Sequence, residues 1–205
     1  MIHDVDEALR ALLERDALAG SGVEVSLEAP SKAWAARQTA PVVDVYLLQI
    51  REDVERRAVQ YEEVRGDRGV VDRRMPPRMF SLTYLVTAWT QRPEDEHRLL
   101  GALLGALLRH PALPRDLLGG ALAEHPAPLR MVVGLPGDDR TSSDVWNALG
   151  GDPKPSLEVV VTAPVDPNRR QEVGPLVTEG PVLRAHAPGA AEVRRLHRPA
   201  DTPRQ

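Results

Sequence analysis

The feature that most constrains the fold is a strand pattern followed directly by a helix pattern, in residues 79–108. Between Met79 and Thr90 apolar side chains alternate with others, which is the period of a strand with one buried face. Pro93 and the acidic residues after it are typical of a first helical turn, and leucines then recur at helical spacing through Leu108. Both elements have an apolar side to bury, so this block predicts a helix packed on a sheet.

Further helices and strands are predicted on both sides of this block. Apolar periodicity predicts helices over 2–13 and 141–149 and strands over 23–27, 42–50, 129–135 and 157–162. This order predicts an α/β (α+β) fold in which helices flank a mixed β-sheet. In the leucine-rich helix, Gly101 and Gly105 have the spacing of a close helix contact, and we expect them to pack on the sheet.

The charged segment Arg56–Arg78 separates two of the predicted strands. It contains Gly66-Asp67-Arg68-Gly69, which is a turn signal, so we expect a long surface hairpin, and a mobile loop is the alternative. Charge runs of this kind are usually solvated, and an interface between subunits is the alternative.

Composition excludes several classes of protein. Lys and Arg total 26 against 30 Asp and Glu, and this net charge of -4 argues against binding nucleic acid or anionic membranes through bulk electrostatics. The absence of cysteine removes disulfides and thiolate chemistry and fits a reducing compartment. The acidic N-terminus does not look like a signal peptide, and Leu99–Leu108, the longest apolar stretch, is far shorter than the roughly 20 residues of a membrane span. We therefore expect a cytoplasmic protein with no membrane span.

The C-terminal segment differs from the rest of the chain in composition. Proline, glycine, arginine and glutamate dominate after Pro164, which predicts a domain of residues 1–164 and an extended Pro/Arg-rich arm of residues 165–205. A strand in this arm would be able to add to the edge of a partner's sheet, whereas a tail without a fixed partner is the alternative. The predicted partner-binding residues are the two apolar pairs of the arm, Leu176, Val177, Val182 and Leu183.

Motifs for catalysis and cofactor binding are absent from the sequence. There is no Gly-x-Ser-x-Gly, no phosphate-binding Gly-x-x-x-x-Gly-Lys-Ser/Thr and no Gly-x-Gly-x-x-Gly. A carboxylate nuclease built on Asp144, Lys154 and Glu158 lacks a lysine after Glu158, where three valines follow. We expect no catalytic residues, no cofactor and no enzymatic activity.

Two groups of residues have partial metal-ligand spacing. Glu94 and His97 stand three apart, but no second pair completes a carboxylate site, and a solvated first helical turn explains them. Asp138, Asp139 and Asp144 do not have the spacing of an EF-hand loop, and a turn before a helix explains them. We expect no metal site.

Three parts of the sequence together resemble a known family. They are Ile2–Leu13, the block Leu82–Thr90 with Glu96–Gly101, and the stretch Ser143–Gly150 with Lys154–Pro164. The last contains Asp-x-Trp-x-Ala-Leu-Gly followed by a proline-led strand, and the middle block is the most specific piece. These parts are spread over most of residues 1–165, and they resemble the cap, or tail-terminator, proteins of extracellular contractile injection systems.

This resemblance implies a structural role in a phage-tail-like particle. It implies a ring, six-fold in number, stacked on the last layer of inner tube and sheath, where it stops polymerisation. The partners would be other copies of the chain, the sheath and the inner tube, and the arm would add a strand to a sheath subunit. Trp89 and Trp146 would be large anchors, or simply core residues. A free-standing ligand- or protein-binding module is the alternative function, and an enzyme of unrecognised type is the third.

Overall fold

The computed structural model describes residues 1–66, 69–134, 139–150, 152–168, 170–172, 182–187 and 190–195. The chain forms two compact units. The first combines Met1–Tyr61 with Met75–Arg169, and the second combines Glu62–Arg74 with Arg170–Gln205.

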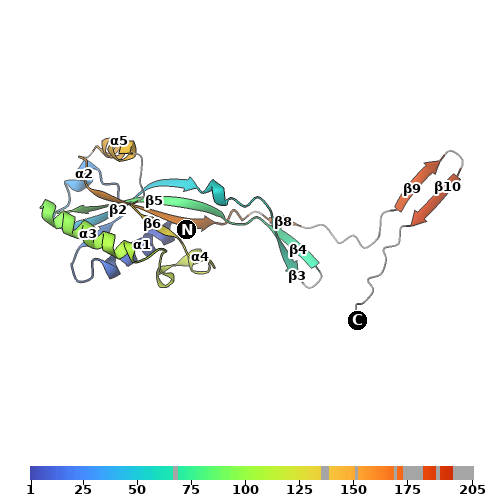
Figure 1. Cartoon of the computed structure of the whole chain (residues 1–205), viewed down its shortest axis with the longest axis horizontal. Helices are drawn as coiled ribbons and strands as arrows, with labels where there is room; N and C mark the ends of the chain where they lie inside the picture. Colours follow the sequence, from blue (N-terminus) through green and yellow to red (C-terminus); the bar gives the residue numbers. More distant parts are fainter. Residues whose placement is uncertain are drawn as a thin grey trace. The chain divides into compact units, whose positions relative to one another are not determined.

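The first unit holds a mixed sheet with helices on both sides. Its strands are β1 (Glu24–Ser26), β2 (Val42–Glu52), β5 (Arg78–Trp89), β6 (Met131–Val133) and β7 (Ser156–Val165). Their order is β1-β2-β5-β7-β6, in which β1 and β2 are parallel and the other pairs are antiparallel. Its helices are α1 (Ile2–Asp16), α2 (Lys32–Ala35), α3 (Pro93–Leu108), α4 (Gly120–Ala123) and α5 (Asp139–Leu149), with short 3-10 turns at Val54–Arg56 and Arg115–Leu117. The predicted α+β class and mixed sheet are confirmed (Figure 1).

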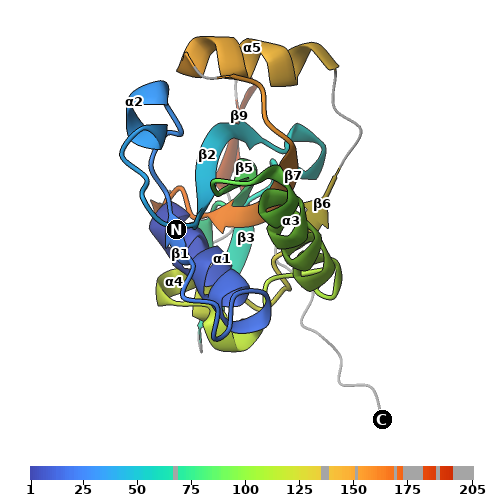
Figure 2. The ribbon, with the colours of Figure 1, turned by 90° about the vertical axis from the view of Figure 1, so that its left-hand side faces the viewer.

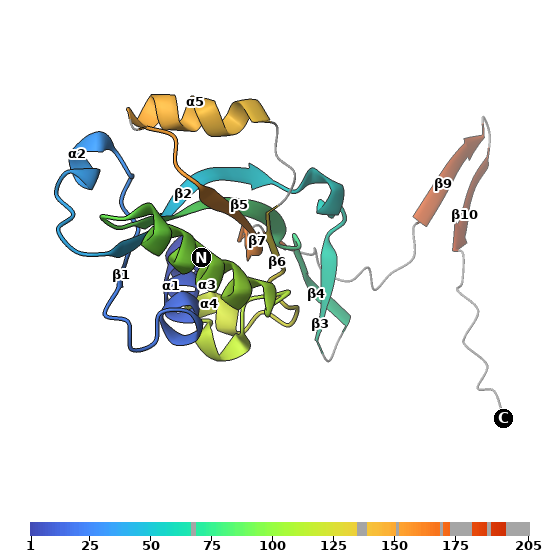
Figure 3. The same cartoon turned by 60° about the vertical axis from the view of Figure 1, so that its left-hand side comes forward.

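The helices are divided between the two faces of this sheet. Figures 2 and 3 show α1, α3 and α4 on one side, here called the inner face, and α5 on the other, the outer face. The inner face carries the aliphatic core, because alternate residues of each strand point to it. Its strand residues are Val43, Val45, Leu82, Tyr84, Val86, Val159, Val161 and Ala163, and its main helix residues are Val5, Leu9, Leu12, Leu13, Leu103 and Leu107.

Hydrogen bonds of polar side chains hold α1 in place. The Tyr84 hydroxyl donates to a carboxylate oxygen of Asp6 at 2.7 Å, which joins the centre of the sheet to the helix. At the other end of α1, Asp16 lies 2.6 Å from the His110 ring just after α3. The Arg15 and His110 contacts lower the pKa of Asp16 to about 2.

The structure corrects the expected orientation of α3. Leu103, Ala106 and Leu107 are its buried residues, whereas Leu108 is 64% exposed. Gly101 and Gly105 are also exposed, and a side chain built on either would meet nothing within 4 Å. The expectation that these glycines pack on the sheet is therefore wrong. Leucines surround more than half of this helix, so spacing alone did not decide which side faces the sheet.

The second unit consists of β-structure in the part that is described. β3 (Glu62–Gly66) and β4 (Gly69–Arg74) form the predicted antiparallel hairpin, and β8 (Arg170–Glu172) pairs with β4. β9 (Val182–Ala187) and β10 (Ala190–Arg195) form a separate antiparallel hairpin.

Candidate interaction surfaces

All three tryptophans of the protein meet on the outer face of the sheet. Trp34 from α2 and Trp89 from the end of β5 form an edge-to-face pair with ring centroids 5.3 Å apart. The ring of Trp146, from α5, lies 6.3 Å from that of Trp89. Such pairs contribute roughly 0.5–1.5 kcal/mol beyond the burial of their area. We call these residues the tryptophan cluster, and it holds α2 and α5 to the outer face.

The ion pair of Lys154 and Glu96 lies beside the tryptophan cluster. Lys154 lies just before β7, and its ammonium group is 4.3 Å from the centre of the Trp89 ring while it also contacts the Glu96 carboxylate. A cation over an aromatic face is attracted by the ring's quadrupole. The cluster thereby brings together residues from the second and third segments that carry the family resemblance. Trp146 is 1% exposed, so it is a core residue, and its contact with Trp89 also anchors α5. Both interpretations of Trp146 therefore hold.

Asp44 is a buried acid on the same outer face. It is fully buried in β2, between Ser26 of β1 and Thr87 of β5, and none of the described residues forms a hydrogen bond of normal geometry with its carboxylate oxygens. Burial raises the pKa of Asp44 to about 7; the Ser26 hydroxyl opposes this rise and the charge of Glu28 adds to it. A buried carboxylate near neutrality is costly when charged, so the outer face is chemically unlike the inner one.

In the sequence, Asp44 interrupts an apolar run. The run from Val42 to Leu48 contains no other charged side chain, and that isolation was the available signal. The burial of Asp44 was not foreseeable, because the period of a strand does not show whether its second face is buried.

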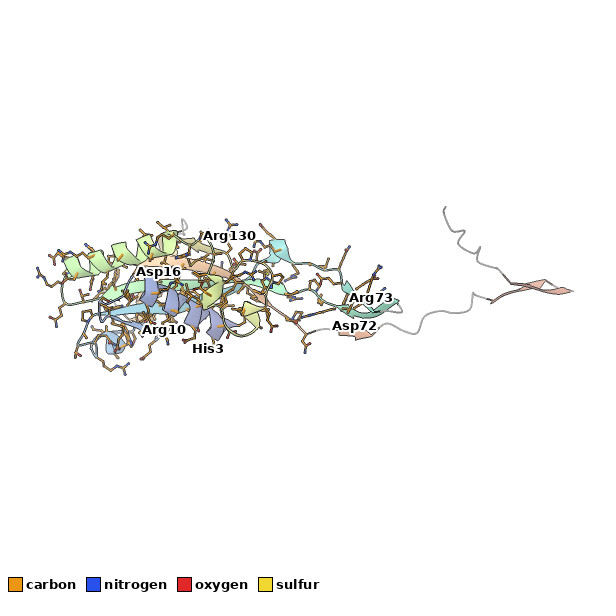
Figure 4. The ribbon with its side chains drawn as sticks, turned by 90° about the horizontal axis from the view of Figure 1, so that it is seen from below. His3, Arg10, Asp16, Asp72, Arg73 and Arg130 are labelled. Carbon is orange, nitrogen blue, oxygen red and sulfur yellow. The ribbon has the colours of Figure 1, made fainter. Side chains whose placement is uncertain are left out.

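The end of β2 and the charged stretch after it present both apolar and ionic side chains to solvent. Ile50, Val54 and Val59 are 47%, 63% and 72% exposed. In the second unit, Glu63 of β3 pairs with Arg65 and with Arg73. Figure 4 labels Arg73 on β4. Exposed pairs of this kind contribute little to stability. The exposed apolar residues of the first unit and the charged residues of the second are each suited to contact with a partner.

The predicted partner-binding residues of the arm lie only partly within the described structure. Leu176 and Val177 lie outside the described residues. Val182 and Leu183 begin β9, where they are paired with Arg195 and Arg194 of β10. These two residues therefore lie in a hairpin, and among the described residues β9 pairs with β10 alone.

The residues with partial metal-ligand spacing do not form a cluster. Within the described ranges, no group of three or more His, Asp or Glu side chains is placed to hold a metal ion. Asp139 and Asp144 lie in α5, and Asp138 falls outside the described residues. Lys154 contacts Glu96, outside the trio with Asp144 and Glu158 that a nuclease would need. Among the helices of the described residues, none combines the length and the apolarity that a membrane span requires.

Comparison with known proteins gives a family and a fold. The family model described as the Pvc16 N-terminal domain matches residues 4–179. A solved sheath/tube terminator of PVC, an extracellular contractile injection system, has a TM-score of 0.67 and 21% identity, covering 93% of this chain and 65% of that one. The tube-terminating cap of the anti-feeding prophage has a TM-score of 0.63 and 19% identity, covering 93% of this chain and 64% of that one. This chain therefore spans less than two thirds of either structure. No curated protein matches the sequence.

Proposed function

We propose, on the premise that this chain belongs to the Pvc16 N-terminal domain family, that it is a structural cap of a contractile injection particle. In this role it ends polymerisation of the tube and sheath at the distal end of the particle. The family match over residues 4–179 is the observation that carries the proposal. The fold likeness to two solved terminators supports it, since one terminates a sheath and tube and the other a tube.

The cap acts by binding, with no reaction and no cofactor. A terminator needs a face that fits the last layer of a polymer and offers no site for the next layer. Its copies form a ring of six in the bacterial cytoplasm, and heterologous contacts between identical copies close such a ring. The exposed apolar residues Ile50, Val54 and Val59 and the charged sheet of β3, β4 and β8 are the surfaces we assign to these contacts.

Residues 165–205 are the arm that attaches the cap to the sheath. We assign Leu176, Val177, Val182 and Leu183 to this contact. Strand addition uses backbone hydrogen bonds, and it therefore tolerates the loose sequence of this segment. The free edge of β9 supports this assignment for Val182 and Leu183.

Electron microscopy of particles from cells lacking this gene tests the proposal. We expect runaway, frayed or absent sheaths, and restored particles of uniform length when the full chain is supplied again. Particles of normal, uniform length without the gene would overturn the cap role and favour a binding module unrelated to the particle. Supplying residues 1–164 alone tests the arm, because unchanged sheath length and attachment would remove residues 165–205 from the contact.

A further inference from the structure

The two edges of the five-stranded sheet differ in whether a further segment of the chain pairs with them among the described residues. The edge at β6 is covered by residues 111–113, because Met131 N–H donates to the Pro111 carbonyl and Leu113 N–H to the Leu129 carbonyl, both at 2.9 Å. A β-bridge between Ala112 and Arg130 continues that cover. At the other edge, β1 pairs with β2 alone among the described residues. An open edge presents unpaired backbone groups and is a template for another strand.

A hollow runs along the open edge of β1. Its volume is about 500 Å³, and it is lined by residues 24–28, by Trp34 and Gln38, and by Val42 of β2. Arg10 of α1 also lines it (Figure 4). The surface beside β1 is therefore recessed, so a strand added there would gain side-chain contacts as well as backbone hydrogen bonds.

The rim of this hollow is acidic. Glu24 and Glu28 are both exposed. Glu28 is paired with Arg37 at 3.3 Å, but both side chains are more than two thirds exposed, and such a pair contributes only about 0–1 kcal/mol. Arg10 is within 3.3 Å of Glu7, which offsets its charge. The rim therefore favours an incoming strand that carries basic residues.

The hairpin of β9 and β10 is the element of this chain that fits the open edge. It is a two-stranded sheet, and a two-stranded hairpin alone is marginally stable in water. The sequence of β10 and the residues after it, 190–198, contains three arginines and one glutamate. The basic residues on the β10 side of the hairpin are therefore complementary in charge to the acidic rim of the β1 edge. Glu172 and Val182 are ten residues apart, which allows a reach of roughly 35 Å.

We propose that β10 of one copy adds to the open β1 edge of a second copy. The proposal rests on the proposed ring, in which each copy gives its hairpin to one neighbour and receives another, as a heterologous contact requires. It leaves the free edge of β9, with Val182 and Leu183, for the sheath. The result is one sheet that continues from the core of one copy, through the hairpin of its neighbour, toward the sheath.

Disulfide trapping in assembled particles tests this contact. The chain contains no cysteine, so each introduced pair is the only pair that the cap can form within itself. Ser26→Cys, in β1, is combined with one cysteine at a time through positions 190–195, and these variants replace the native chain in the cell. After oxidation we expect covalent multimers of the cap, with yields several-fold higher at alternate positions, because alternate residues of a strand lie on the same face. Val133→Cys, on the covered β6 edge, is the matched control and is expected to give none.

Two further outcomes decide between this contact and its rivals. When chains carrying only Ser26→Cys are mixed with tagged chains carrying only the arm cysteine, a mixed dimer is expected. A linked monomer without multimers would mean that the hairpin folds back on its own β1 edge, and it would overturn the proposal. Equal yields of multimers at all six positions, or no multimers at any position, would also overturn the proposed contact. In that case, particles of normal length that contain the chain would still support the cap role. Absence of the chain from particles would overturn the cap role and this contact together.

Discussion

The two faces of the five-stranded sheet are both buried, but by different chemistry. On the inner face, aliphatic residues pack against α1 and α3, and the Tyr84 hydroxyl is satisfied by Asp6. The outer face holds the tryptophan cluster and Asp44, and both this carboxylate and the indole N–H of Trp146 are buried without a hydrogen-bond partner among the described residues. Apolar burial stabilises the fold by roughly 25 cal/mol per Å², whereas an unpaired buried polar group costs about 1–3 kcal/mol. The inner face therefore supplies most of the stability.

A cavity in the inner face is expected to have the largest effect. Leu12 of α1 is fully buried in the aliphatic core. Leu12→Ala is expected to lower the free energy of unfolding by about 2–5 kcal/mol, because contacts are lost and the surrounding side chains only partly collapse into the cavity. Urea unfolding followed by circular dichroism measures this. Leu108→Ala, at a leucine that is 64% exposed, is the matched control and is expected to change stability by less than about 0.5 kcal/mol. Equal losses would contradict the division into faces.

Removing the charge of Asp44 is expected to act in the opposite direction. The pKa of Asp44 is about 7 in the folded chain and about 4 when unfolded, so between these values the folded state holds a proton that the unfolded state has lost. Stability therefore falls as pH rises from 4 to 7, and the full penalty, about 4 kcal/mol at most, is present above pH 7. Asp44→Asn is expected to remove this dependence and to be more stable than the native chain at pH 8.

Unfolding free energies at pH 4.5 and pH 8 check this prediction. The difference between Asp44→Asn and the native chain is expected to grow toward pH 8. Asp152→Asn, at an exposed acid near the tryptophan cluster, is the control and is expected to follow the native profile. A constant difference at both pH values would show that the carboxylate of Asp44 does not carry the penalty.

Sequence patterns predicted the inner face better than the outer one. Alternation places Leu82, Tyr84 and Val86 on one side of β5 without knowledge of any partner, and the structure confirms this. The cover of the outer face depends on contacts between residues far apart in sequence, as between Trp34 and Trp89, and periodicity does not contain this information. The hairpin of β9 and β10 had a local signal that was overlooked, since Pro188-Gly189 between the strands is a turn dipeptide.

The open β1 edge is another feature that the sequence did not reveal. A run such as 23–27 predicts a strand but not its neighbours, and the β6 edge is closed only because residues 111–113 return beside it. The same limit applies to the proposed cap role, because the physical patterns predicted only a fold class and the proposal rests on the family. The type of an element follows from its local pattern. Which sheet edges stay open, what packs on each sheet face and where interfaces form depend on tertiary contacts.

Trp146 gives the smallest of the expected changes in global stability, because its loss is local. Among the residues of α5 from Asp144 to Leu149, Trp146 alone is buried. Trp146→Ala is therefore expected to release α5 rather than to leave a cavity, so the loss is limited to the free energy of that local opening and is smaller than for Leu12→Ala. Hydrogen exchange is expected to accelerate in α5 while β5 and α1 keep their protection, and Trp146→Phe, which keeps an aromatic ring against Trp89, is expected to restore most of the protection. Faster exchange across α1 and β5 would mean instead that the outer face is as much a part of the core as the inner face.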